Sequence, residues 1–110
     1  MNQTIQIPVG GRQHLIPSEI MHLQASVNYT LLFLKNGKKL MVATPLKTLA
    51  SRLEPFSFFR VHKSHLINLA YIKNICPYNN TIEMIDKNQF ELARRRVTNF
   101  KKELKYFLND

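Results

Sequence analysis

Four polar residues, His62, Lys63, Ser64 and His65, interrupt two apolar runs in the segment "FFRVHKSHLINLAYIKN". A lysine ammonium is a compact positive charge that suits a phosphate oxygen, and a serine hydroxyl and an imidazole N–H are further donors. The cluster therefore has the chemistry needed to contact a polyanion. The alternative is an ordinary solvated turn between two strands, and these residues alone favour neither interpretation.

A second basic cluster, Arg94-Arg95-Arg96, separates the last strand-like segment from the last helical pattern. A guanidinium group forms bidentate hydrogen bonds to guanine O6 and N7, and equally to phosphate. Because side chains alternate in direction along a strand end, we expect only one or two of the three to face a partner. For Arg96 a purely solubilising role is a direct competitor.

Asn28 and Tyr29 form a third candidate site, in a loop expected between two strands. An asparagine amide pairs with adenine, and a tyrosine stacks or donates its hydroxyl. The alternative is a turn asparagine beside a half-buried tyrosine.

The histidines raise the question of a metal, because His62 and His65 are separated by two residues. Two imidazoles are an incomplete site, and no cysteine or carboxylate cluster is near them in the sequence. A metal-dependent nuclease would need grouped carboxylates, whereas the seven acidic residues are scattered. We therefore expect no metal, no cofactor and no enzymatic activity.

The net charge indicates the class of partner. Sixteen basic residues against seven acidic ones give a formal charge of +9, which favours nucleic acid and, less strongly, an anionic membrane surface. The alternative is that the charge only keeps the protein soluble. A chain of 110 residues is expected to form one domain, spanning 1–110.

The single cysteine, Cys76, has no partner for an internal disulfide, which fits a reducing compartment. No apolar run is long enough to cross a bilayer, and the first residues lack the features of a signal peptide. We expect a cytoplasmic location without membrane insertion.

Alternating apolar residues indicate many short strands. The clearest pair flanks Asn36-Gly37, which suits a two-residue hairpin turn, and an earlier pair turns at Gly10-Gly11. Further strands are expected in "SEIMHLQAS", "FFRVH", "LINLAYIKNI", "TIEMI" and "QFELA".

Two helical patterns accompany these strands. In "TPLKTLASRLEP" we expect Thr44 as the N-cap, Pro45 as the first helical residue and Pro55 as the end. The last seventeen residues form the second pattern, which places four apolar residues on one face: Val97, Phe100, Leu104 and Phe107. Strands with a short internal helix and a C-terminal helix predict a mainly β (α+β) domain.

Together these segments resemble the LytTR family, the DNA-binding domain of LytR-, AgrA- and AlgR-type bacterial response regulators of two-component systems. The family pattern runs Phe-x-Arg-x-His-basic-Ser, then an aromatic or apolar pair, then Val/Ile-Asn and an apolar residue. It matches here at Phe58, Arg60, His62, Lys63, Ser64, Leu66, Ile67, Asn68 and Leu69. "IMHLQASVNYTLLFLKNGKKL", "PLKTLASRL" and "FELARRRVTNFKKEL" also resemble family segments, in the family's order.

The chain departs from the family at two positions. His65 stands where the family has an aromatic or apolar residue, and Ala93 stands where it often has a serine before its arginine pair. A phosphate contact from that serine hydroxyl is therefore absent.

The resemblance implies an elongated, multi-sheet antiparallel β domain whose loops enter two successive major grooves of duplex DNA. It implies direct-repeat sites, bound by homodimers or tandem copies. By position in the pattern, Lys63 with Ser64 or His65 would contact the backbone, as would Arg94, while Arg95 would read a base. Asn28 and Tyr29 would enter the other groove, and Arg60 and Asn68 would have structural roles.

The expected function is that of a sequence-specific DNA-binding transcriptional regulator. The rival binding function is an RNA-associated module, for which the sequence lacks an aromatic sheet motif or a Gly-x-x-Gly loop. A metal-dependent nuclease is the weaker alternative. The 110 residues hold no receiver domain, and the initiating Met favours a stand-alone regulator controlled by a partner protein over a piece of a longer chain.

Overall fold

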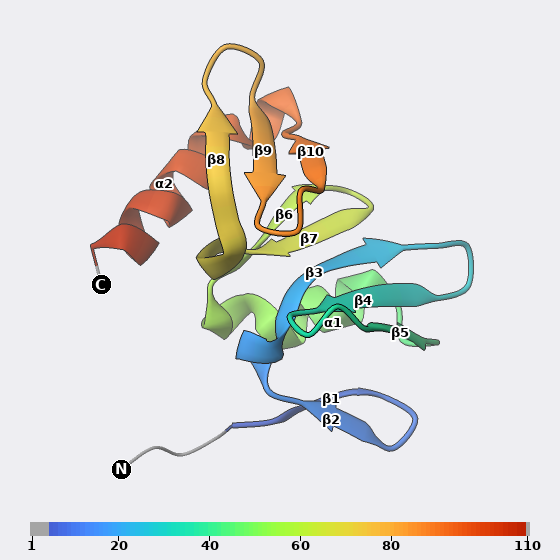
Figure 1. The fold of residues 1–110 in the computed structure, drawn as a ribbon. Coiled ribbons are helices and arrows are strands. Elements are labelled where there is room, and N and C mark those ends of the chain that lie inside the picture. Colours follow the sequence, from blue (N-terminus) through green and yellow to red (C-terminus); the bar gives the residue numbers. More distant parts are fainter. Residues whose placement is uncertain (1–4, 110) are drawn as a thin grey trace.

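The computed structural model describes residues 5–109, in which ten strands, two α-helices and four short 3-10 helices follow one another (Figure 1). The strands are β1 (Ile7–Gly10), β2 (Gln13–Leu15), β3 (Ile20–Ala25), β4 (Thr30–Leu34), β5 (Lys39–Val42), β6 (Phe58–His62), β7 (His65–Asn68), β8 (Ile72–Cys76), β9 (Thr81–Met84) and β10 (Gln89–Glu91). The helices are α1 (Leu46–Leu53) and α2 (Val97–Leu108), with η1 (Pro17–Glu19), η2 (Glu54–Phe56), η3 (Leu69–Tyr71) and η4 (Arg94–Arg96). The expected mainly β (α+β) class is confirmed.

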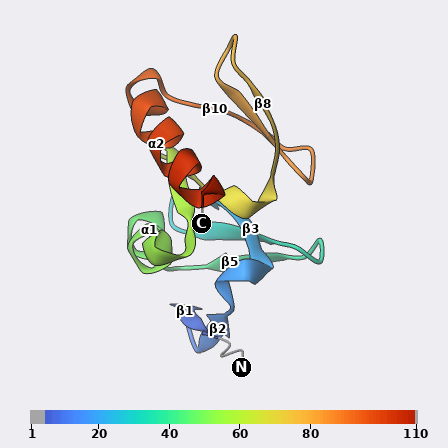
Figure 2. The same ribbon diagram turned by 90° about the vertical axis from the view of Figure 1, so that its left-hand side faces the viewer.

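The strands form three antiparallel sheets. The central sheet has the order β5-β4-β3-β7-β6, and it is accompanied by the β1-β2 hairpin and by a three-stranded sheet in the order β10-β9-β8. The β1-β2 hairpin and α1 lie on one side of the central sheet, and the three-stranded sheet and α2 lie on the other (Figures 1 and 2).

Alternation along the central strands divides their side chains between two cores. In β7, Leu66 packs in the first core with α1 and the β1-β2 hairpin, whereas Ile67 packs in the second core. In β6, Phe58 and Val61 divide in the same way. Because both faces are covered, these strands read as nearly continuous apolar runs in the sequence.

The two helices bury the faces that their periodicity indicates. Leu46, Leu49 and Leu53 of α1 are buried in the first core. The apolar face of α2 packs in or against the second core through the four residues expected: Val97, Phe100, Leu104 and Phe107. The lysines of α2 remain exposed.

Both predicted hairpins are present, but the second has a longer turn than expected. The Leu34 N–H donates to the Lys38 carbonyl at 2.9 Å, so three residues rather than two form the loop. Gly37, at φ +88, occupies the left-handed position that a three-residue loop requires. The Asn36 side chain accepts from the Lys38 N–H at 2.9 Å.

The start of α1 differs from the prediction. Pro45 is the N-cap, with extended φ and ψ of −61° and 147°, and the helix begins at Leu46. Thr44 lies outside the helix because its carbonyl accepts a hydrogen bond from Thr30 Oγ1 at 2.7 Å.

The segment expected as one strand in "LINLAYIKNI" is two strands separated by η3. Asn68 is buried, and its Oδ1 accepts from the Ala70 N–H while its Nδ2 donates to the Ile20 carbonyl, both at 3.0 Å. These bonds cap the turn that carries the chain from the central sheet into the three-stranded sheet.

The molecule is flattened rather than elongated, with principal extents of 42 × 40 × 24 Å. The expected elongation is not present: the three-stranded sheet and α2 lie on one side of the central sheet, and the β1-β2 hairpin lies on the other (Figure 2). Within the described part of the chain, no helix combines the length and apolar character needed to cross a bilayer.

Candidate nucleic-acid interface

The polar cluster of His62, Lys63, Ser64 and His65 forms the tip of the β6-β7 hairpin. His62 pairs with His65, which leaves Lys63 and Ser64 as the two turn residues. The Arg60 guanidinium donates to the Lys63 carbonyl. The Ser64 N–H donates to His62 Nδ1 at 3.2 Å, so the proton of a neutral His62 ring lies on Nε2. The side chains of His62 and Lys63 are exposed on a tip whose backbone is held in place.

The β3-β4 loop lies beside this tip. The Ala25 N–H donates to the Ser64 carbonyl at 2.8 Å, which joins the two loops directly. The Ser26 N–H donates to the Tyr29 carbonyl at 2.7 Å, so Val27 and Asn28 are the outermost residues of the loop. Asn28 and Tyr29 are both exposed, as a contact role requires.

The three arginines form the 3-10 turn η4 rather than the strand end expected from the sequence. They follow a short β10 that ends at Glu91, and the turn is fixed to β6 by two hydrogen bonds. The Ala93 N–H donates to the Val61 carbonyl at 3.3 Å, and Arg96 Nη1 donates to the Arg60 carbonyl at 3.2 Å. Arg94 and Arg95 are exposed, whereas Arg96 is half-buried.

Arg60 is hydrogen-bonded both to the β6-β7 tip and to η4. Its guanidinium holds the Lys63 carbonyl, and its own carbonyl holds Arg96, which agrees with the structural role expected for it. Burial lowers the pKa of Arg60, and the positive charge of Arg96 lowers it further. The two guanidinium groups are thus held close together by backbone carbonyls, without a carboxylate between them.

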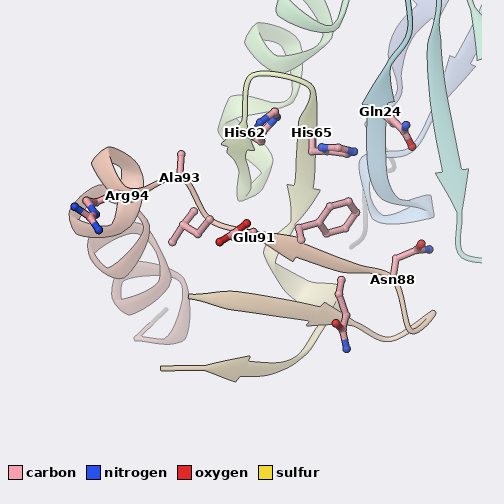
Figure 3. A pocket seen from close by; sticks show the side chains of 10 residues that line it. Gln24, His62, His65, Asn88, Glu91, Ala93 and Arg94 are labelled. Carbon is pink, nitrogen blue, oxygen red and sulfur yellow. The ribbon is translucent and has the colours of Figure 1, made fainter. Parts of the chain in front are cut away.

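The hairpin tip, β10 and η4 surround an open hollow of about 490 Å³ (Figure 3). His62 and His65 reach it from the hairpin, Gln24 from β3, and Glu91 and Arg94 from the chain after β9. The hollow places the histidine pair and the arginine turn on the same side of the molecule. We call this side the flank, and it comprises the β3-β4 loop (residues 26–29), the β6-β7 tip (62–65) and η4 (94–96).

His65 forms a wall of this hollow. Its ring lies 4.8 Å from the Phe90 ring and 5.8 Å from the His62 ring, measured between centroids. Burial lowers the pKa of His65, and the neighbouring His62 and His22 lower it further. A half-buried neutral imidazole against Phe90 explains how a histidine occupies a position where the family has an apolar residue.

A pair formed by the buried His22 and the half-buried Asp86 is absent from the expectations drawn from the sequence. His22 Nε2 and Asp86 Oδ2 are 2.8 Å apart, and Asn88 Nδ2 also donates to Asp86 Oδ2 at 2.9 Å. The pair joins β3 to the β9-β10 turn, 64 residues apart in the sequence. The only indication in the neighbouring sequence is a histidine among the apolar residues of β3, and this does not identify Asp86 as its partner.

The ionisation of this pair follows from its burial. Desolvation lowers the pKa of His22, and this effect outweighs the hydrogen bond and charge of Asp86, which raise it. His22 Nδ1 has no hydrogen-bond partner, so a neutral ring with its proton on Nε2 avoids an unpaired buried N–H. Burial raises the pKa of Asp86, but the hydrogen bonds from His22 and Asn88 lower it by more.

The positive charge of the described residues is not neutralised internally. Among residues 5–109 the one side-chain contact of salt-bridge geometry is the hydrogen bond between the neutral His22 ring and Asp86, so lysines and arginines there lie beyond 4.0 Å of any carboxylate. In the same range, no three histidine, cysteine or acidic side chains are grouped to hold a metal ion. The groups at the flank are arginine and lysine cations, two imidazoles, amides and hydroxyls, with Glu91 as a carboxylate in the lining of the hollow.

The fold and this flank define a mainly β domain that presents basic loops on one side. The model of the LytTR family, the LytTr DNA-binding domain, matches residues 11–105, and the chain belongs to this family. Among solved structures, the chain is similar to the LytTr DNA-binding domain of a response regulator from Bacillus cereus. The two are 19% identical with a TM-score of 0.73, over 94% of this chain and 98% of that one. A search of curated proteins found no match.

Proposed function

We propose that the protein is a transcriptional regulator that binds duplex DNA sequence-specifically, with loops in successive major grooves of a direct-repeat site. Its family is a DNA-binding one. The observation that carries the proposal is the shared flank. The β3-β4 loop, the β6-β7 tip and η4 are linked in series by the bonds Ala25–Ser64 and Ala93–Val61, so one duplex surface can meet all three.

In this arrangement the hairpin tip anchors the phosphate backbone. Lys63 supplies a mobile charge, and the Ser64 hydroxyl and the His62 Nε2–H supply directed donors. His65 contributes mainly by supporting the tip through Phe90.

The three arginines of η4 have different roles in this arrangement. Arg95 is exposed and reads a base, Arg94 at the rim of the hollow contacts the backbone, and Arg96 holds η4 against β6. At the other end of the flank, Asn28 pairs with a base and Tyr29 donates its hydroxyl.

The dimensions of the molecule suit two grooves. Successive major grooves on one face of B-DNA are about 34–36 Å apart. The two long extents of the protein are 42 and 40 Å, slightly more than that spacing.

The proposal is tested by selecting binding sites from a random duplex library and measuring affinity for the enriched site by fluorescence polarisation. We expect an enriched sequence, steep loss of affinity with added salt, and weak competition by single-stranded RNA. Lys63→Ala is the variant of interest, and Lys102→Ala on the exposed face of α2 is the matched control.

An unenriched library, or tighter binding to the RNA competitor than to duplex, would refute the proposed function. Equal loss of affinity in Lys63→Ala and Lys102→Ala would refute the assignment of the flank.

A further inference from the structure

Val27 is an apolar residue at the tip of a loop of the proposed interface. Its side chain is 94% exposed and is therefore accessible to a partner. It is one of the two outermost residues of the β3-β4 loop, beside Asn28, and contributes to neither core. The side chain is therefore not used by the fold and can be replaced without disturbing either core.

The loop that carries Val27 is held at a fixed place on the flank. The bond between Ser26 and Tyr29 closes the loop at 2.7 Å, and the bond between Ala25 and Ser64 joins it to the hairpin tip at 2.8 Å. Valine is also stiff about its first side-chain torsion. The methyl groups of Val27 are thus presented in a defined position next to the polar atoms of Asn28.

The major groove contains one apolar group that such a side chain fits, the 5-methyl of thymine. Resting on the proposed function, we infer that Val27 is a specificity-determining residue that contacts a thymine methyl beside the base read by Asn28. Thymine is distinguished there by van der Waals contact and by loss of water from two apolar surfaces, so no hydrogen bond is required.

The inference is tested with uracil, which keeps the hydrogen-bonding groups of thymine and lacks its methyl. In the site selected from the random library, each thymine is replaced in turn by deoxyuridine, and affinities are measured for the wild type and for Val27→Ala. At one thymine we expect the wild type to lose affinity about fourfold, the value for one buried methyl-sized group. In Val27→Ala the loss at that thymine should be much smaller, while losses at other thymines stay unchanged.

Two further variants separate a specific contact from a general effect. Val27→Ser removes both γ-methyl groups and leaves a hydroxyl, so the same thymine should lose its advantage. Leu108→Ala also removes an exposed aliphatic side chain, 69% exposed at the far end of α2, and should leave every uracil effect as in the wild type (Figure 1). Thermal unfolding should be unaltered in Val27→Ala because its side chain packs against neither core.

The inference is overturned if a site is selected but no thymine in it depends on Val27, including the case of a site without thymine near this loop. Failure to select any duplex is a different result, because it removes the proposed function and the inference together.

Discussion

At the residue scale, the flank is built from cations whose positions are set by backbone carbonyls. Arg60 donates to the Lys63 carbonyl, and Arg96 donates to the Arg60 carbonyl, while Arg94 and Arg95 remain exposed. The three adjacent arginines thus differ in their surroundings, because only Arg96 is held by a backbone carbonyl. The sequence shows the run of charge but not this division, which depends on a contact 36 residues away.

The exposed Arg95 provides the first prediction. Arg95→Ala should cost roughly 1–3 kcal/mol of binding free energy and relax the preference at one base pair. Titrations with every single-base variant of the selected site would measure both effects. Arg96→Ala serves as the comparison, since its loss should act on η4 as a whole. Unchanged binding of Arg95→Ala to the preferred site would show that another residue reads the base.

Lys63 at the hairpin tip should behave differently. Lys63→Ala should weaken binding to all duplexes alike and lower the slope of log K against log salt by about one unit, because one phosphate contact is lost. The slope is obtained from affinities at several salt concentrations. A loss confined to one sequence would instead assign Lys63 to base reading.

At the scale of elements, turns and hydrogen bonds between distant segments determine where the flank forms. The strands, both hairpins and the buried face of α2 follow from periodicity, since alternation and a 3.6-residue repeat are local signals. Three features could not be predicted from periodicity: the break in the strand at η3, the 3-10 form of η4 and the His22–Asp86 pair. Asn68 caps η3 through the Ala70 N–H and also donates to the Ile20 carbonyl, and no local pattern reports that second contact, 48 residues away.

The buried His22 should make stability depend on pH. Its pKa, like that of His65, is lowered in the folded chain from the ordinary value of 6.5. Below pH 6.5 the unfolded chain therefore binds protons that the folded chain does not, so the free energy of unfolding falls as pH is lowered. Urea unfolding at a series of pH values between about 7 and 5 would show this decrease.

A variant identifies the contribution of His22. His22→Phe keeps an aromatic ring against Phe33 and Phe90 and removes the titrating group, so the decrease should become shallower. Ser51→Ala, at an exposed residue that does not titrate, should leave the decrease unchanged. An identical pH dependence in the wild type and His22→Phe would contradict the assignment. The pKa of Asp86 is also lowered in the folded chain. Its contribution to the free energy of unfolding is therefore lost only at lower pH, as the pH falls through that lowered pKa.

At the scale of the whole molecule, the arrangement of the three sheets places all three loops on one flank. The sequence pattern was sufficient to identify the family, whose model matches residues 11–105. The overall shape was not, because elongation was expected and the extents describe a flat body. How far one sheet folds over another depends on packing between distant segments, which no local pattern reports.

A flank of fixed geometry predicts a fixed spacing on DNA. Inserting about five base pairs between the segment read by the β3-β4 loop and the segment read by Arg95 turns one of them to the opposite face of the duplex. We expect affinity to fall toward that for unrelated duplex, and an insertion of about ten base pairs should not restore it for a single domain. Affinities for a graded series of insertions test this, and full tolerance of the five-base-pair insertion would contradict simultaneous contact.

The central sheet is covered on both of its faces, and its strand ends are left free. The residues that hold the molecule together and the residues at the flank are therefore separate sets, with Arg60, Arg96 and His65 as the few members that serve both. Positions such as Val27, Asn28 and Arg95 can exchange side chains without opening a cavity. A scaffold of this kind can acquire new target preferences one loop at a time while its folding remains unaffected.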